Sequence, residues 1–166
     1  MGLAAWSADG KTFIPGTSAG SGAVSEQAAA KAARTAMETR QTQLGTAVPA
    51  AKATYDTAQA VADLVSKRDT AGTELANAQS ALNSDSAGLP SGATVPTNTT
   101  EAETAYKAAA AADQAAYQKV WDDYKAIDTA NKTIGDCKAD IVKYKDGNGV
   151  SYSGDVSAAT VAAPLA

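Results

Sequence analysis

The sequence predicts an all-α fold: an alanine-rich, elongated antiparallel helical hairpin or three-helix bundle with extended N- and C-terminal arms. Three observations support this prediction. Apolar residues recur at three- and four-residue intervals through the middle of the chain, which is the spacing of a helix that buries one face. Alanine, a strong helix former, makes up about a quarter of the residues. Segments rich in Gly, Pro, Ser and Thr separate and flank these stretches.

The composition also predicts a thin hydrophobic core. Alanine buries little apolar surface, and the aromatic residues are two Trp, six Tyr and one Phe in 166 residues. A monomer with such a core is only marginally stable for its length. We therefore expect the protein to work as a subunit, in a homo-oligomer or beside neighbouring structural proteins.

Residues 1–24 are predicted to form the extended N-terminal arm. This segment is dense in Gly, Ser, Pro and Thr and shows no helical period. Asp9 and Gly10 form a dipeptide that suits a tight hairpin turn. A small β-hairpin is therefore expected here, and its large side chains Trp6 and Phe13 are expected to contact other subunits.

Residues 25–145 are predicted to form the helical bundle. The first helix is expected at about 26–44, with Met37 and Leu44 on its apolar face, and it should end at Gly45, a frequent helix terminator. A second helix is expected at about 49–82, because Pro49 suits a first helical position. One long helix kinked at Gly45–Pro49 remains the alternative.

The remaining elements follow from turn residues and caps. Residues 83–100 contain two prolines and are predicted to form a long polar loop. Thr100 and Glu103 have the capping-box spacing, so a third helix is expected at about 101–144. Residues 146–166 form the predicted C-terminal arm, which opens with turn residues that suit a second small hairpin.

The third helix carries a predicted packing seam. Its large residues alternate at intervals of three and four, as in helices that pack along one stripe. If the second helix folds back about a loop centre near position 91, the aromatic start of this seam lies against the small residues Ala58, Ala62 and Val65. The seam comprises Tyr117, Val120, Trp121, Tyr124, Ile127, Ile134 and Ile141.

Two polar residues, Asn131 and Lys138, fall on the same predicted seam. Polar seam residues can fix register and partner number at a cost in stability. Alternatively, the seam leaves the core at this point and the lysine side chain extends to water. We expect assembly contacts at Trp6, Phe13, Asn131, Lys138 and Tyr152.

The sequence predicts no catalytic residue, cofactor or metal site. It contains no histidine, so the lone thiol of Cys137 has no imidazole base or zinc co-ligand, and we expect a small buried hydrophobic side chain. Asp136 and Asp140 are one helical turn apart but are expected to be solvated surface residues. Asp128 and Lys132 are expected to form a weak ion pair.

The charge pattern and the lengths of the apolar runs argue against two classes of partner, nucleic acid and membrane. There are 18 acidic and 14 basic residues, for a net charge of −4, and the basic residues are scattered among the acids. Phosphate backbones need clustered positive charge, so no nucleic acid is expected. No apolar run is long enough to span a bilayer, so no membrane is expected either.

We expect a non-enzymatic structural subunit of a large assembly, synthesised in the cytoplasm and located in a virion or another particle. Among such subunits, the architecture favours a bacteriophage virion protein: a connector, collar, fibre or decoration component. The alternative is a helical binding module or secreted effector that grips a protein partner. It would use the 83–100 loop or the aromatic cluster between Tyr117 and Tyr124.

Overall fold

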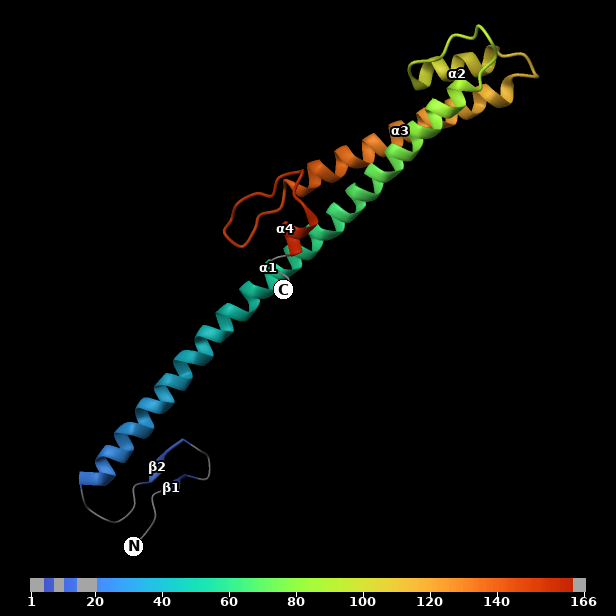
Figure 1. Cartoon of the computed structure of the whole chain (residues 1–166). Helices are drawn as coiled ribbons and strands as arrows, with labels where there is room; N and C mark the ends of the chain where they lie inside the picture. Colours follow the sequence, from blue (N-terminus) through green and yellow to red (C-terminus); the bar gives the residue numbers. More distant parts are fainter. Residues whose placement is uncertain (1–4, 8–10, 15–20, 163–166) are drawn as a thin grey trace. The chain divides into compact units, whose positions relative to one another are not determined.

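The computed structural model describes residues 5–7, 11–14 and 21–162 (Figure 1). The described part is mostly helical, so the predicted all-α class is confirmed. Contacts divide the chain into two units, Met1–Lys52 and Ala53–Ala166, and each is described by itself.

The first unit contains two very short strands. Strand β1 (Ala5–Trp6) and strand β2 (Phe13–Ile14) pair antiparallel. In this register Trp6 lies opposite Phe13. The predicted turn at Asp9–Gly10 and the side chains of Trp6 and Phe13 lie outside the described residues.

Helix α1 (Ser21–Ala87) is one continuous helix of 67 residues and contributes to both units. The prediction of two helices that end at Gly45 and begin at Pro49 is therefore wrong, and the single-helix alternative holds for these residues. Pro49 removes one backbone donor, the N–H that would bind the Gly45 carbonyl. Helix growth is cooperative and the flanking alanines favour it, so the loss of one hydrogen bond does not end the helix.

In the second unit, the later part of α1 runs antiparallel to helix α3 (Gln114–Ile141) (Figure 1). At one end the Lys119 Nζ lies 4.0 Å from an oxygen of Asp85. At the other end Ile141 shares a buried cluster with Val65. The predicted register is wrong, because Val65 lies against the end of α3 and not against its aromatic start.

The register differs because the predicted third helix is interrupted. Helix α2 (Thr99–Ala108) ends before α3 begins, and α2 packs against α3. The Ala110 carbonyl oxygen accepts hydrogen bonds from the Asp113 and Gln114 N–H groups, which closes the intervening turn. The alanines around this turn favour helix, but helix propensity is weak compared with tertiary packing. Helix α2 and the turn lie between α1 and α3 in the sequence. The point about which α1 and α3 fold back therefore lies later in the sequence than the predicted position 91.

Helix α2 begins two residues earlier than predicted. Its N-cap is Asn98, whose side-chain oxygen accepts a hydrogen bond from the Glu101 N–H at 2.9 Å. The Glu101 carboxylate in turn accepts from the Thr97 N–H at 2.8 Å. Hydrogen bonds to this carboxylate from the Thr97 N–H and then the Thr97 hydroxyl lower the pKa of Glu101. The predicted capping box at Thr100 and Glu103 is therefore wrong, although the physical principle is the same.

The C-terminal segment folds back onto the two long helices. After α3, Lys145 and Ser151 form an isolated antiparallel bridge. Helix α4 (Ala158–Ala162) follows, and its Val161 is fully buried. The prediction of an extended arm is thus wrong for this segment, because its few large apolar residues cover the end of the helical pair.

The core of the second unit is small and aliphatic. Its buried cluster contains few side chains larger than valine, as the alanine-rich composition predicts. Partly buried side chains from α1 and the C-terminal segment surround it. The cluster consists of Ala58, Val61, Val65, Ile141 and Val161, with Ala62, Leu64, Tyr144, Tyr152 and Val156 at its edge.

Candidate functional site

The buried line of α3 is displaced from the predicted seam. All seven predicted seam residues are at least half-buried, and Val120 and Ile141 are fully buried. The line itself passes through Ala130 and Cys137 and not through their neighbours Asn131 and Lys138. Sequence reasoning followed the large residues and missed these two small ones, although the intervals of three and four from Val120 lead to both. Cys137 is 2% exposed, so its prediction as a buried hydrophobic residue is confirmed.

The two polar residues assigned to the seam have different surroundings. Asn131 is exposed. The Lys138 Nζ lies 2.6 Å from an oxygen of Asp155 in the C-terminal segment. Lys138 therefore interacts within its own chain, and the expectation that Asn131 and Lys138 form assembly contacts stays a prediction.

Three interactions hold the C-terminal segment against the helices; residues 154–161 are called the C-terminal clasp below. Arg68 of α1 donates a hydrogen bond from Nη1 to the Gly154 carbonyl oxygen at 2.8 Å. The hydrogen bond from Lys138 lowers the pKa of Asp155. Val161 then completes the apolar core.

Gly154 allows this close approach. A Cβ atom at this position would lie 3.1 Å from the Lys138 Cβ and 3.2 Å from the Lys138 carbonyl oxygen. The latter atom belongs to the backbone of α3 and cannot move freely. These distances are shorter than ordinary van der Waals contacts, so a larger residue here would require the clasp or α3 to shift by a few tenths of an ångström.

A polar residue that sequence reasoning overlooked lies on the buried line of α3. Asp123 is half-buried, and its Oδ2 is buried with no hydrogen-bond partner among the described residues. Burial, followed by the charge of Asp85 on α1, raises the pKa of Asp123. The positive charge of Lys119 lowers the pKa of Asp123, but by less than burial and Asp85 raise it. The Lys119 Nζ lies 4.0 Å from an oxygen of Asp85. The two carboxyl groups therefore destabilise this end of the helical pair when both are charged.

The aromatic residues near the loop are engaged within the chain. The rings of Tyr106 on α2 and Trp121 on α3 stack with centroids 5.3 Å apart. The Lys125 Nζ lies 4.1 Å from the Trp121 ring centre. The Tyr124 hydroxyl donates to the Pro96 carbonyl oxygen at 2.6 Å. These contacts fix α2 and the end of the preceding loop on α3.

The surface carboxylates of α3 pair with lysines close by in sequence. Asp136 lies 2.6 Å from the Lys132 Nζ, and Asp140 lies 2.6 Å from the Lys143 Nζ. Asp128 instead accepts a hydrogen bond from Thr99, so the predicted pair of Asp128 with Lys132 is wrong. The part of the chain that the structure describes has no group of three or more acidic or cysteine residues that could hold a metal ion.

The described helices also lack the length of apolar sequence needed to cross a membrane. The last predicted contact residue, Tyr152, is half-buried at the edge of the core. Its N–H donates to the Tyr144 carbonyl oxygen at 3.1 Å. Its role in assembly stays a prediction.

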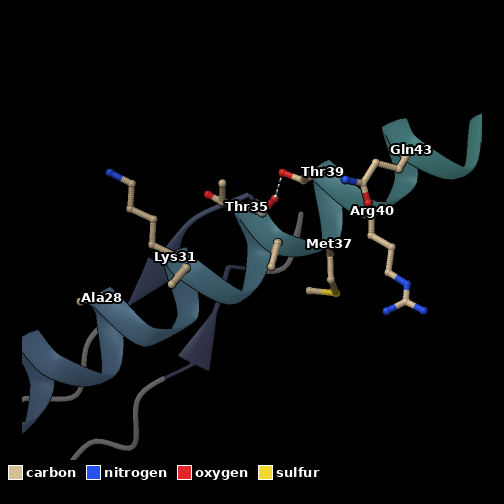
Figure 2. Close-up of a pocket in the computed structure, with 9 residues that line it drawn as sticks. Ala28, Lys31, Thr35, Met37, Thr39, Arg40 and Gln43 are labelled. Carbon is tan, nitrogen blue, oxygen red and sulfur yellow. Dashed lines mark hydrogen bonds between the residues drawn. The ribbon is translucent and has the colours of Figure 1, made fainter. Parts of the chain in front are cut away.

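In the first unit, α1 is open to solvent. Nine of its residues between Ala28 and Gln43 form an open stretch of the helix surface, and all nine are exposed. Figure 2 shows Thr35 and Thr39 on one side of the helix and the Met37 side chain on the other. The Thr39 hydroxyl donates to the Thr35 carbonyl oxygen at 2.9 Å, so this polar group is satisfied within the helix.

The side chains of α1 from Glu26 to Lys52 are all exposed except that of Ala30, which is half-buried. Three of them are large and apolar: Met37 is 67% exposed, Leu44 53% and Val48 62%. These three residues recur seven and then four positions apart, so they lie on one side of the helix. They are called the exposed helix face below.

Comparison of the chain with protein-family models, curated proteins and solved structures finds no match in any of the three.

Proposed function

We propose that the chain is a non-enzymatic structural subunit of a large assembly. The exposed helix face is the observation that carries this proposal. Large apolar residues that remain exposed on a helix would be stabilised by burial against a partner. The proposal places Met37, Leu44 and Val48 against another protein subunit.

The energetics of the segment support a protein partner. Burying one such side chain contributes about 1.5–3 kcal/mol relative to leaving it exposed. Isolated helices are marginal in water even when they are rich in alanine. An ion pair between Arg34 and Glu38, at 2.8 Å, adds only about 0.3–0.5 kcal/mol. Association would stabilise this part of α1 far more than its own local interactions do.

Within this class, we propose a bacteriophage virion protein: a connector, collar, fibre or decoration component located in the assembled particle. The support is compositional and architectural. The chain combines about one quarter alanine and a thin core with a long stretch of exposed helix. Such a chain gains most of its burial from repeated neighbours, as a particle subunit does. This narrower proposal rests on analogy of architecture and not on a motif.

Isolation from the native source tests the proposal. The tagged chain should sediment with a large symmetric particle in a density gradient and be detected there by mass spectrometry. Leu44→Lys should reduce its incorporation, whereas Thr35→Lys, on the opposite side of α1, should not. A chain that sediments only as a free monomer or with a single soluble partner would contradict the proposal. The loop predicted at 83–100 is shorter in the structure, where it covers residues 88–98 between α1 and α2. If binding to that partner were lost on deletion of residues 88–98, a binding module would be supported instead.

A further inference from the structure

The exposed helix face has a pattern that identifies its occupant. Leu44 follows Met37 by about two helical turns and Val48 follows Leu44 by about one, so the three side chains form one apolar line. We propose that this line binds a second copy of the same chain, which lies antiparallel against it. This inference deepens the proposed function, on which it rests, because it names the partner of one subunit surface.

Charges on one flank of the line select the antiparallel orientation. Glu38, Gly45 and Lys52 are spaced by seven residues, so they lie on the same flank. A two-fold axis near Gly45 places Glu38 of each copy beside Lys52 of the other. Two opposite-charge pairs then form symmetrically, in addition to the interactions that Glu38 and Lys52 already make within their own chains. In a parallel pairing at equal height, Glu38 and Lys52 stay about four turns apart and cannot meet.

The same axis also matches the apolar residues. It places Leu44 of each copy within about 3 Å, along the helix axis, of the height of Val48 of the other, which gives two equivalent central contacts. The Glu38 carboxylate is 59% exposed and remains accessible beside its intrahelical partner Arg34. A self-complementary surface of this kind is what a two-fold interface requires.

The opposite side of the helix has a different character and provides a control. Thr35 lies half a turn around the helix from Leu44, since nine residues rotate the helix by about 180°. Figure 2 shows Thr35 and Thr39 pointing away from the side that carries Met37. A charged substitution at Thr35 should therefore leave the proposed contact intact while changing the same helix to a similar extent.

The contact should be weak in solution. Standard interfaces bury about 800 Å² per partner, and three large side chains on one helix supply less than that. We therefore expect a dissociation constant on the order of 100 μM for the purified chain. In an assembly with many copies, such contacts gain strength through multivalency.

Sedimentation of the full-length chain up to about 1 mM tests the surface. The parent chain should dimerise, and Leu44→Lys should raise the dissociation constant at least about tenfold. Thr35→Lys should leave it within about twofold, and circular dichroism should show equal helix content in both variants. A parent chain that stays monomeric over this range would overturn the proposal. An equal loss of dimer in the two variants would do the same.

A charge exchange tests the orientation. Glu38→Lys and Lys52→Glu should each weaken the dimer, and the double variant should restore it, because the opposite-charge pairs reform. In addition, two copies of Gly45→Cys should be joined by a short bifunctional thiol reagent, because flank positions of packed helices are too far apart for a direct disulfide. There is open space around the Gly45 Cα, and the axis brings the two thiols near each other. Thr35→Cys is the control and should not cross-link. Failure of the double variant to recover, or equal cross-linking of the two cysteine variants, would exclude the antiparallel arrangement.

These outcomes are separable from failure of the proposed function. A chain that is found in large particles but is monomeric after purification would refute the second-copy inference alone. A chain that dimerises through this face but never sediments with a particle would refute the structural-subunit proposal alone.

Discussion

Arg68 and Gly154 are 86 residues apart in sequence, yet the Arg68 guanidinium donates a hydrogen bond to the Gly154 carbonyl oxygen at 2.8 Å. This bond connects α1 to the C-terminal clasp. Together with Lys138 and Val161 it closes the core of the second unit. The clasp makes the helical pair a folded unit whose stability can be tested by point substitutions.

Gly154→Ala should destabilise the second unit by about 1–3 kcal/mol, because a methyl group would press on the Lys138 backbone. Gly72→Ala is the matched control. Gly72 lies inside α1, and a Cβ atom added there would have no neighbour within 4 Å, so alanine should stabilise the helix by about 0.5–1 kcal/mol. Urea unfolding measures both changes. If Gly154→Ala were neutral or stabilising, the close approach of the clasp to α3 would be in error.

Asp123→Asn should stabilise the second unit at neutral pH by about 1 kcal/mol, because it removes a half-buried charge close to Asp85. The pKa of Asp123 is raised above its ordinary value of 3.8. Its favourable contribution to folding is therefore complete below that value and is lost as pH rises through the raised pKa.

Thermal unfolding between pH 3 and 7 measures this linkage. The advantage of Asp123→Asn over the parent chain should grow as pH rises through the range in which Asp123 ionises. Asp122→Asn is the control with the opposite sign, since hydrogen bonds from Lys125 and Gln118 lower the pKa of Asp122. A parent chain and an Asp123→Asn variant with identical pH profiles would rule out the repulsion.

The clasp should loosen in acid. Its ion pair depends on the Asp155 carboxylate, whose pKa is lowered by Lys138. The contribution of this pair is present above the ordinary pKa of 3.8 and disappears as pH falls through the lowered value. The methyl resonances of Val161 in NMR spectra should broaden or shift in that range. Asp155→Asn should show the altered spectrum already at pH 7, whereas Asp136→Asn, which carries a comparable ion pair elsewhere on α3, should not.

Tyr124→Phe should cost about 1–2 kcal/mol of unfolding free energy. The substitution removes the hydroxyl that donates to the Pro96 carbonyl oxygen and leaves this acceptor of a buried proline unpaired. Tyr117→Phe is the control, because the Tyr117 hydroxyl makes no hydrogen bond to another described residue. Equal stability of the two variants would show that the hydrogen bond to Pro96 contributes nothing measurable.

The helical class and the position of the seam could be predicted from the sequence because both depend on local periodicity. The exact buried line was missed, because the prediction followed large side chains and Ala130 and Cys137 are small, although the three- and four-residue intervals from Val120 lead to both. Asp123 was overlooked for a related reason: a carboxylate is not expected on a buried line. Its position there follows from the register with Asp85, which depends on the tertiary fold.

The helix boundaries show the same division between local and distant causes. Pro49 is a strong local signal for a helix start, but the helix formers on both sides outweigh it. Alanine near Ala110 is a strong local signal for helix, but stacking of Tyr106 on Trp121 accompanies a turn there. At Pro49 the deciding cause is therefore also local, whereas near Ala110 the turn accompanies a tertiary contact.

The burial of Val161 has a consequence for how the protein is made. Its partners in the core, such as Val61, are about a hundred residues earlier in the chain. During translation these partners leave the ribosome long before Val161 does, and they remain uncovered in the meantime. Nascent chains of this length with exposed apolar residues are prone to aggregate and are protected by chaperones. The emergence of Val161, and not the formation of the long helices, therefore completes the core.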